Sequence, residues 1–212
     1  MAVCLSVTTR LLLLVGNDAI LGERANQLTA VATDHDFPHW RAEGTIFRGW
    51  ALVKHRDLAE GISLLRSGAA AYRATGAELW MPHYTSLLAR GCGMAAQIEE
   101  GLALLDDALQ ICERTGERWL TAELYRHKGE LLRCLGDAEA AEELYGQATS
   151  IAREQMAKLW ELRAAVSLAQ LRCDQGRRAE ARDLLAPVHG CFTEGFDTQD
   201  LKKAKALLDE LA

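Results

Sequence analysis

The sequence predicts an all-α fold, a right-handed α-solenoid in which antiparallel helical hairpins stack on one another. The first observation is a column of small residues spaced 40 apart: Gly49, Ala89, Gly129 and Ala169. The second is another small column, twelve residues after the first: Gly61, Gly101, Ala141 and Ala181. The third is an unbroken leucine column, three residues further on: Leu64, Leu104, Leu144 and Leu184. Internal periods of about 20 to 50 residues are typical of stacked arrays, and several columns in one phase are not expected by chance.

The small columns have a steric explanation. Two antiparallel helices approach closely only where side chains are small, so Gly or Ala at matched positions lets each hairpin close. The leucines then fill the space between hairpins, because no single hairpin can bury both of its faces. Apolar residues within each period also follow helical spacing, as Leu124 and Leu131 do. Gly136 then breaks this helix, and Asp137 is a suitable N-cap for the next one.

The chain is predicted to form a single repeat domain, 1–212. It divides into a degenerate first repeat, four full repeats and a C-terminal capping helix: 1–38, 39–78, 79–118, 119–157, 158–196 and 197–212. Helices are expected at 18–33, 39–55, 57–75, 79–94, 97–115, 119–135, 137–154, 158–175, 177–192 and 198–211. The last helix suits a solvating cap, because Leu201 and Ala204 share one face while Lys202, Lys203 and Lys205 point to water.

Composition excludes several function classes. A net charge of −6 and a pI near 5.6 argue against nucleic-acid binding, which needs a basic surface. The six cysteines form no CxxC pair, which favours the reducing cytoplasm and makes disulfides improbable. The apolar run Leu11–Val15 is too short for a signal peptide or a membrane span. We interpret it as the remnant of a helix from a preceding, degenerate repeat, which favours a chain that is a fragment or a mis-started reading frame of something longer.

The columns resemble the tetratricopeptide repeat pattern. The copy at 119–157 matches it best, at the signature positions Tyr125, Gly129, Leu132, Gly136, Ala141, Tyr145 and Ala148. The period here is 40 residues rather than the usual repeat of about 34, and the proline at the repeat end is missing. This departure implies longer helices or longer loops than the family standard.

A second resemblance concerns the C-terminal half. The stretches "AELYRHKGELL" and "ELRAAVSLAQL" are similar to the repeat region of large bacterial signalling proteins. Those proteins carry a class III adenylate cyclase or a transcriptional-regulator domain, then a predicted ATPase, then such repeats. This sequence contains neither the cyclase nor the ATPase part, so the resemblance carries neither activity over.

The tetratricopeptide resemblance also implies a binding surface, because the first helix of each repeat lines a concave groove. The residues that this places in a peptide-binding groove are Trp50, Lys54, His83, Arg90, Glu123, Arg126, Glu130, Arg133, Arg163, Gln170 and Asp174. Arginine side chains can pair carboxylates and phosphates through two hydrogen bonds, so an acidic or phosphorylated peptide is the expected ligand. The alternative is a solvated face with ion pairs inside each helix. Trp50 is equally consistent with a groove anchor and with a residue buried between helices.

No motif points to catalysis, a metal or another cofactor. The segment Asp34-His35-Asp36 with His39 has metal-capable side chains, but Pro38 interrupts the helix and no second cluster completes a zinc site. We interpret it as a polar turn. Gly91-Cys92-Gly93 lacks the third glycine of a dinucleotide loop, and no nucleophile has an evident His/Asp partner set.

The sequence therefore predicts a non-enzymatic protein–protein interaction scaffold without cofactors, the regulatory or sensory repeat region of a cytoplasmic bacterial signalling protein. Its expected partner is a protein or peptide, with its own missing catalytic or ATPase domains among the options, and neither a nucleic acid nor a membrane. The alternative is a structural scaffold that forms a homo-oligomer through an exposed end repeat. The apolar run Leu11–Val15 is the observation that suggests this alternative.

Overall fold

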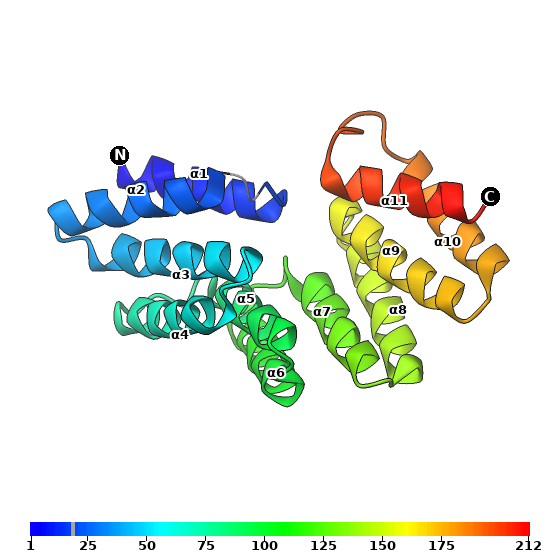
Figure 1. The fold of residues 1–212 in the computed structure, drawn as a ribbon, viewed down its shortest axis with the longest axis horizontal. Helices are drawn as coiled ribbons and strands as arrows, with labels where there is room; N and C mark the ends of the chain where they lie inside the picture. The colour runs from blue at the N-terminus through cyan, green and yellow to red at the C-terminus, as the bar shows by residue number, and fades with distance from the viewer. Residues whose placement is uncertain (18–19) are drawn as a thin grey trace. The chain divides into compact units, whose positions relative to one another are not determined.

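The computed structural model describes residues 1–17 and 20–212, which form eleven α-helices and no strand (Figure 1). The chain divides into two compact units, Met1–Gly116 and Glu117–Ala212. Unit 1 contains α1 (Ala2–Leu14), α2 (Leu21–Asp34), α3 (Pro38–Lys54), α4 (Leu58–Ala74), α5 (Met81–Met94) and α6 (Ile98–Thr115). Unit 2 contains α7 (Thr121–Cys134), α8 (Ala138–Glu154), α9 (Lys158–Asp174), α10 (Arg178–Gly190) and α11 (Gln199–Glu210). The all-α repeat fold predicted from the sequence is confirmed, whereas the single continuous domain stays a prediction.

Helix bounds follow the predicted ranges closely, with one addition. The structure forms a complete helix at α1, where the sequence indicated only a short helical remnant. This helix is apolar on nearly all sides, so its periodicity is weak and easily missed. The predicted helix at 18–33 begins at Leu21 in the structure, and its positions 18–19 lie outside the described residues. The long period is accommodated by long helices, such as the 17 residues of both α3 and α4.

The small-residue columns mark the closest approach of paired helices. A Cβ added to Gly49 on α3 would lie 2.8 Å from the backbone nitrogen of Leu65 and 2.9 Å from the Gly61 oxygen on α4. In unit 2 a Cβ at Gly129 would lie 2.7 Å from the Tyr145 ring. Both distances are shorter than van der Waals contact, so these hairpins close only because the side chain is absent.

The turns repeat with a second, shorter spacing. A residue with positive φ follows most helices, at every twentieth position: Gly16, Asp36, Arg56, Gly76, Ala96, Gly116, Gly136, Met156 and Gly176. A left-handed residue just after a helix C-terminus is a common way to end it, and glycine adopts this conformation without steric cost. Four of these positions are not glycine, so the strict twenty-residue spacing is not visible in the sequence.

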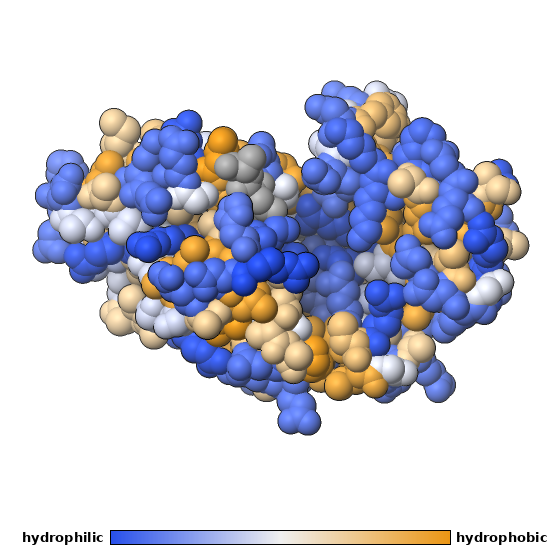
Figure 2. All heavy atoms as spheres, viewed as in Figure 1, coloured by the Kyte–Doolittle hydropathy of each residue, from blue (hydrophilic) through white to orange (hydrophobic). Residues whose placement is uncertain are grey.

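Each unit has its own apolar core. In unit 1 the cluster includes Leu28, Phe47, Leu65 and Leu87, all almost fully buried. In unit 2 Leu162 and Leu185 pack with Leu201 of α11. The helix α11 buries this apolar side and exposes Lys202, Lys203 and Lys205, while its role as a cap of the array stays a prediction. The face of the molecule in Figure 2 is largely hydrophilic, interrupted by smaller hydrophobic groups.

Candidate functional site

The residues predicted to line a groove lie on α3, α5, α7 and α9, the first helices of four hairpins. In unit 1, Trp50 is only 3% exposed and belongs to the core cluster. The Arg90 guanidinium lies 4.5 Å from its ring centroid, and Lys54 Nζ lies at 6.0 Å. Of the two interpretations of Trp50 left open by the sequence, the structure therefore supports burial between helices. His83 is also buried, near the rings of Trp80 and Tyr84.

Unit 1 also contains a buried polar contact across three first helices. Glu43 of α3 is fully buried, and its Oε1 accepts a hydrogen bond of 2.7 Å from Arg10 Nη2 of α1. The same oxygen accepts a short hydrogen bond from the Tyr84 hydroxyl of α5. Burial, with the neighbouring Glu43 charge, raises the pKa of Tyr84 well above its ordinary value, so Tyr84 stays the donor. Arg10 also lies over the Trp80 ring, 4.4 Å from its centroid.

Sequence reasoning missed the role of Arg10 and Tyr84. The available signal was that Arg10 is the single charged residue in the apolar segment that forms α1. A lone charge on such a helix is expected to find a partner on the side that is buried.

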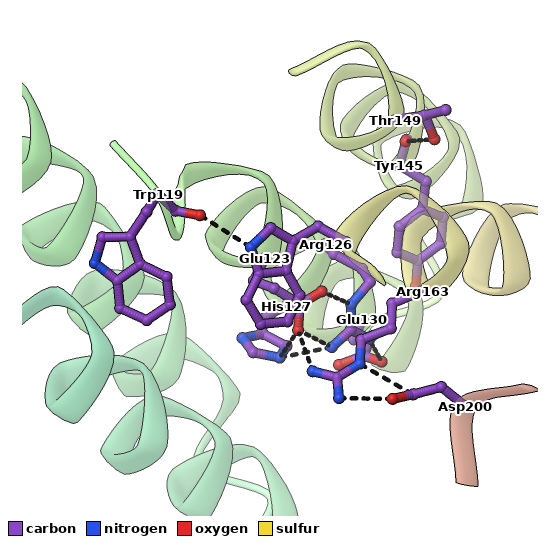
Figure 3. A network of polar contacts seen from close by, with 10 residues as sticks. Trp119, Glu123, Arg126, His127, Glu130, Tyr145, Thr149, Arg163 and Asp200 are labelled. Atoms are coloured by element: carbon purple, nitrogen blue, oxygen red, sulfur yellow. Dashed lines mark hydrogen bonds and ion pairs between the residues drawn. The ribbon is translucent and has the colours of Figure 1, made fainter. Parts of the chain in front are cut away.

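Unit 2 carries the densest polar network, centred on Arg126 of α7 (Figure 3). Arg126 donates to both carboxylate oxygens of Glu123, at 2.6 and 3.0 Å, and makes a short hydrogen bond to Glu130. Burial alone would lower the pKa of Arg126, but these two carboxylates outweigh it and raise the pKa. His127 Nε2 lies 2.7 Å from Arg126 Nη2. A guanidinium only donates, so the His127 nitrogen must accept.

The network continues from α7 to α9 and α11. Arg163 of α9 reaches Glu123 of α7 at 3.4 Å and pairs with both carboxylate oxygens of Asp200 on α11, at 3.0 and 2.7 Å (Figure 3). Its guanidinium also lies 5.0 Å from the Trp160 ring centroid. Charged side chains thus connect the first helices of successive hairpins to the capping helix.

The outer end of this surface is more open. Arg133 of α7 pairs with Asp174 of α9 at 2.8 Å, and both side chains are about half exposed, at 47% and 48%. Gln170 donates to the other oxygen of Asp174 at 3.0 Å. The structure thus gives Arg126, Arg133 and Arg163 carboxylate partners, and an anionic ligand would have to compete with those partners.

The metal-capable segment near Asp34 forms a turn. His35 stacks on Phe37, and the His39 ring lies 4.7 Å from that of Tyr72. Within residues 1–17 and 20–212, no group of three His, Cys, Asp or Glu side chains could hold a metal ion. Over the same residues, no helix combines the length and apolarity needed to span a membrane.

A shallow pocket in unit 1, not anticipated from the sequence, opens where α4 and α6 end and α5 begins. Two ion pairs lie at its edge, Arg73 with Asp107 at 2.9 Å and Arg114 with Glu78 at 2.7 Å. All four side chains are about half exposed, so the pocket lacks the buried polar group of a built ligand site.

Residues 83–154 match the tetratricopeptide repeat family. This segment therefore contains tetratricopeptide repeats. The chain is 30% identical over 162 residues to an uncharacterized protein of Rhizobium meliloti (strain 1021). That match covers 73% of this chain but only 16% of the Rhizobium protein.

Several solved structures have a similar fold. A Rap protein complexed with competence and sporulation factor matches with a TM-score of 0.78 at 14% identity, over 98% of this chain and 56% of that one. A variant of a Podosopora anserina kinesin light chain with nearly identical TPR-like repeats gives a TM-score of 0.61 at 19% identity, over 88% and 92%. BtubC from P. vanneervenii gives 0.65 at 16% identity, over 93% and 87%. At these identities the likeness shows the fold alone.

Proposed function

We propose that this chain is a non-catalytic scaffold that binds a protein or peptide through its first helices. The observation that carries the proposal is the tetratricopeptide repeat itself, since the fold presents long, regular helix surfaces for partner binding. The Rap protein with the same fold was solved in complex with competence and sporulation factor, which supports the same use of the fold.

The contact surfaces that we propose, one in each unit, are the more exposed parts of the predicted groove set. In unit 1 Lys54 keeps accessible polar atoms, whereas Trp50 is buried. In unit 2 Arg133, Gln170 and Asp174 keep accessible polar atoms, whereas Arg126 is buried. An acidic peptide would gain most by displacing Asp174 from Arg133, because a half-exposed ion pair contributes only about 0.2–1 kcal/mol. We therefore expect modest affinity that weakens as salt rises.

The cellular setting is part of the proposal. The Rhizobium relative is much longer than this chain, and the repeats resemble those of cytoplasmic bacterial signalling proteins. A regulatory repeat region of such a protein could bind a separate partner or the protein's own catalytic or ATPase domains.

The test compares partners recovered from an extract of the source cell. We expect the charge reversals Lys54→Glu and Arg133→Glu to lose partners that the wild-type chain retains. Arg126→Glu is unsuitable, because it would place a third carboxylate beside Glu123 and Glu130. The matched control is Arg66→Glu on α4, a half-exposed arginine that is likewise paired, with Glu100. Identical partners for all three variants and the wild type would rule out the first-helix surface.

Self-association is a second candidate function, and one observation favours it. The helix α1 and its C-cap Val15 expose apolar side chains within the described residues, among them Leu11 and Val15. An exposed apolar helix face of this kind is more often an interaction site than a solvated surface.

A further inference from the structure

The ion pair between Arg163 of α9 and Asp200 of α11 has the geometry of a bound ligand carboxylate. Arg163 Nε lies 3.0 Å from one oxygen of Asp200, and Nη2 lies 2.7 Å from the other (Figure 3). A guanidinium binds the carboxylates of ligands through the same pair of parallel hydrogen bonds. The contact of Arg163 with Glu123 is longer, at 3.4 Å, so Asp200 makes the closer contact of the two.

The forty-residue register shows that an acid is unusual at this position. The residues of earlier repeats that are equivalent to Asp200 are large and apolar: Trp40, Trp80, Leu120 and Trp160. In unit 2, Trp160 packs from this position on Trp119, with ring centroids 6.3 Å apart. At the start of α11, the aromatic contact is thus replaced by an ion pair.

The apolar side of α11 already holds this helix in place. Leu201, Ala204 and Leu207 are at most 4% exposed and belong to the core of unit 2. An ion pair removed from water often stabilises a fold no better than apolar side chains of the same size. The attachment of α11 therefore does not require an acid at position 200, and a role in binding explains the acid better.

Both side chains of the pair remain within reach of solvent, at 18% exposed for Arg163 and 21% for Asp200. Arg163 also shares one face of α9 with Gln170 and Asp174, which lie seven and eleven residues further on. A ligand on the proposed unit 2 surface would therefore meet Asp200 as a competitor for Arg163.

We propose that Asp200 occupies Arg163 in place of an acidic side chain of the ligand, so that α11 limits binding to the unit 2 surface. The ligand class is a peptide with aspartate or glutamate side chains, since these carry the group that Asp200 supplies. The inference rests on the proposed scaffold function and adds its regulation. Because Asp200 belongs to the same chain, it competes at a high effective concentration.

Fluorescence anisotropy of a rhodamine-labelled hexaglutamate peptide, titrated with the full chain at low salt, tests the proposal. Asp200→Asn removes the competing charge and keeps a side chain of the same shape. This variant should bind the peptide about fivefold more tightly than the wild type, which is the upper contribution of one accessible ion pair. The matched control is Asp209→Asn, which removes the same charge from the same helix, where Asp209 pairs with Lys205 of α11 itself. It should bind like the wild type.

The double variant Arg163→Gln, Asp200→Asn separates competition at Arg163 from a detached α11. Affinity gained through Arg163 disappears in the double variant, whereas affinity gained by detachment of α11 would persist and overturn the proposal. Equal affinities of Asp200→Asn and Asp209→Asn overturn it too, as does a lack of binding by every variant. The scaffold function is tested separately through Lys54 and Arg133, so it can survive each of these results.

Discussion

At the scale of single residues, glycines decide where two paired helices can approach each other closely. Gly129 lies where a Cβ would enter the Tyr145 ring, whereas a Cβ at Gly146 of α8 would have nothing within 4 Å. Both glycines are inside helices, so their intrinsic cost to helix stability is the same. The difference between them is packing alone.

This contrast gives a matched pair of substitutions. Gly129→Leu should lower the free energy of unfolding by about 1–3 kcal/mol or more, because the added side chain forces the hairpin apart. Gly146→Leu should leave stability unchanged or raise it by up to about 1 kcal/mol, since leucine is the better helix former. Urea denaturation of the two variants measures both effects. Equal midpoints would contradict the assigned close approach between α7 and α8.

Backbone conformation gives a second prediction at this scale. Met156 has φ of 53°, and its side chain is exposed, so it gains little from packing in the left-handed region. Met156→Gly should raise the free energy of unfolding by about 0.5–1 kcal/mol, because glycine adopts this conformation without the Cβ clash. Gly136→Ala, at an equivalent turn with φ of 85°, should lower it. A thermal melt in which Met156→Gly is the less stable protein would contradict this account.

At the scale of helices, ion pairs connect elements that the apolar core already brings together. Glu142 of α8 accepts hydrogen bonds from Arg177 Nη1 at 2.7 Å and from Arg172 Nε of α9 at 3.1 Å. The hydrogen bond from Arg177, followed by that from Arg172, lowers the pKa of Glu142 below its ordinary value of 4.5. The folded state therefore favours the ionised carboxylate of Glu142 over its protonated form.

A lowered folded-state pKa has a definite consequence for stability. The contribution of Glu142 is present above pH 4.5, the unfolded value, and is lost as the pH falls through the folded-state pKa. Glu142→Gln should reduce stability at pH 7 by about 1 kcal/mol and have a smaller effect at pH 3. Denaturant titrations at both values measure this, with the exposed Glu154→Gln of the same helix as control. A loss of equal size at pH 3 would mean that the charge is irrelevant.

The sequence predicted most helices because their columns reflect backbone contacts that only small residues allow. It did not predict α1 as a whole helix, since an apolar segment without a polar face has no clear period. The polar network was only partly predictable. Spacings of three and four indicated pairs such as Glu123 with Arg126, but the contact of Arg163 with Asp200 depends on how α9 and α11 pack. Helix packing also decides which side chains are buried, so the sequence could not distinguish a buried Trp50 from a Trp50 that anchors a ligand in the groove.

At the scale of the whole molecule, each unit has a buried core of its own. In repeat arrays stability is approximately a sum of local and nearest-neighbour contributions, so damage in one repeat weakens with distance along the chain. Hydrogen exchange on Gly129→Leu should therefore show its largest loss of protection within 117–212, with the core of 1–116 retaining most of its protection. Equal losses throughout would show that all described helices open as one cooperative domain.

The left-handed turn at every twentieth residue also bears on how such a chain can change in length. A gene that gains or loses forty codons between two equivalent turns keeps each later helix in phase, so each first helix still follows a second helix. A gain of twenty codons would preserve every turn but exchange the two helix types, so residues selected for burial would meet solvent. The combination of a twenty-residue turn spacing with a forty-residue repeat thus permits variation in the number of whole hairpins and opposes the addition of single helices.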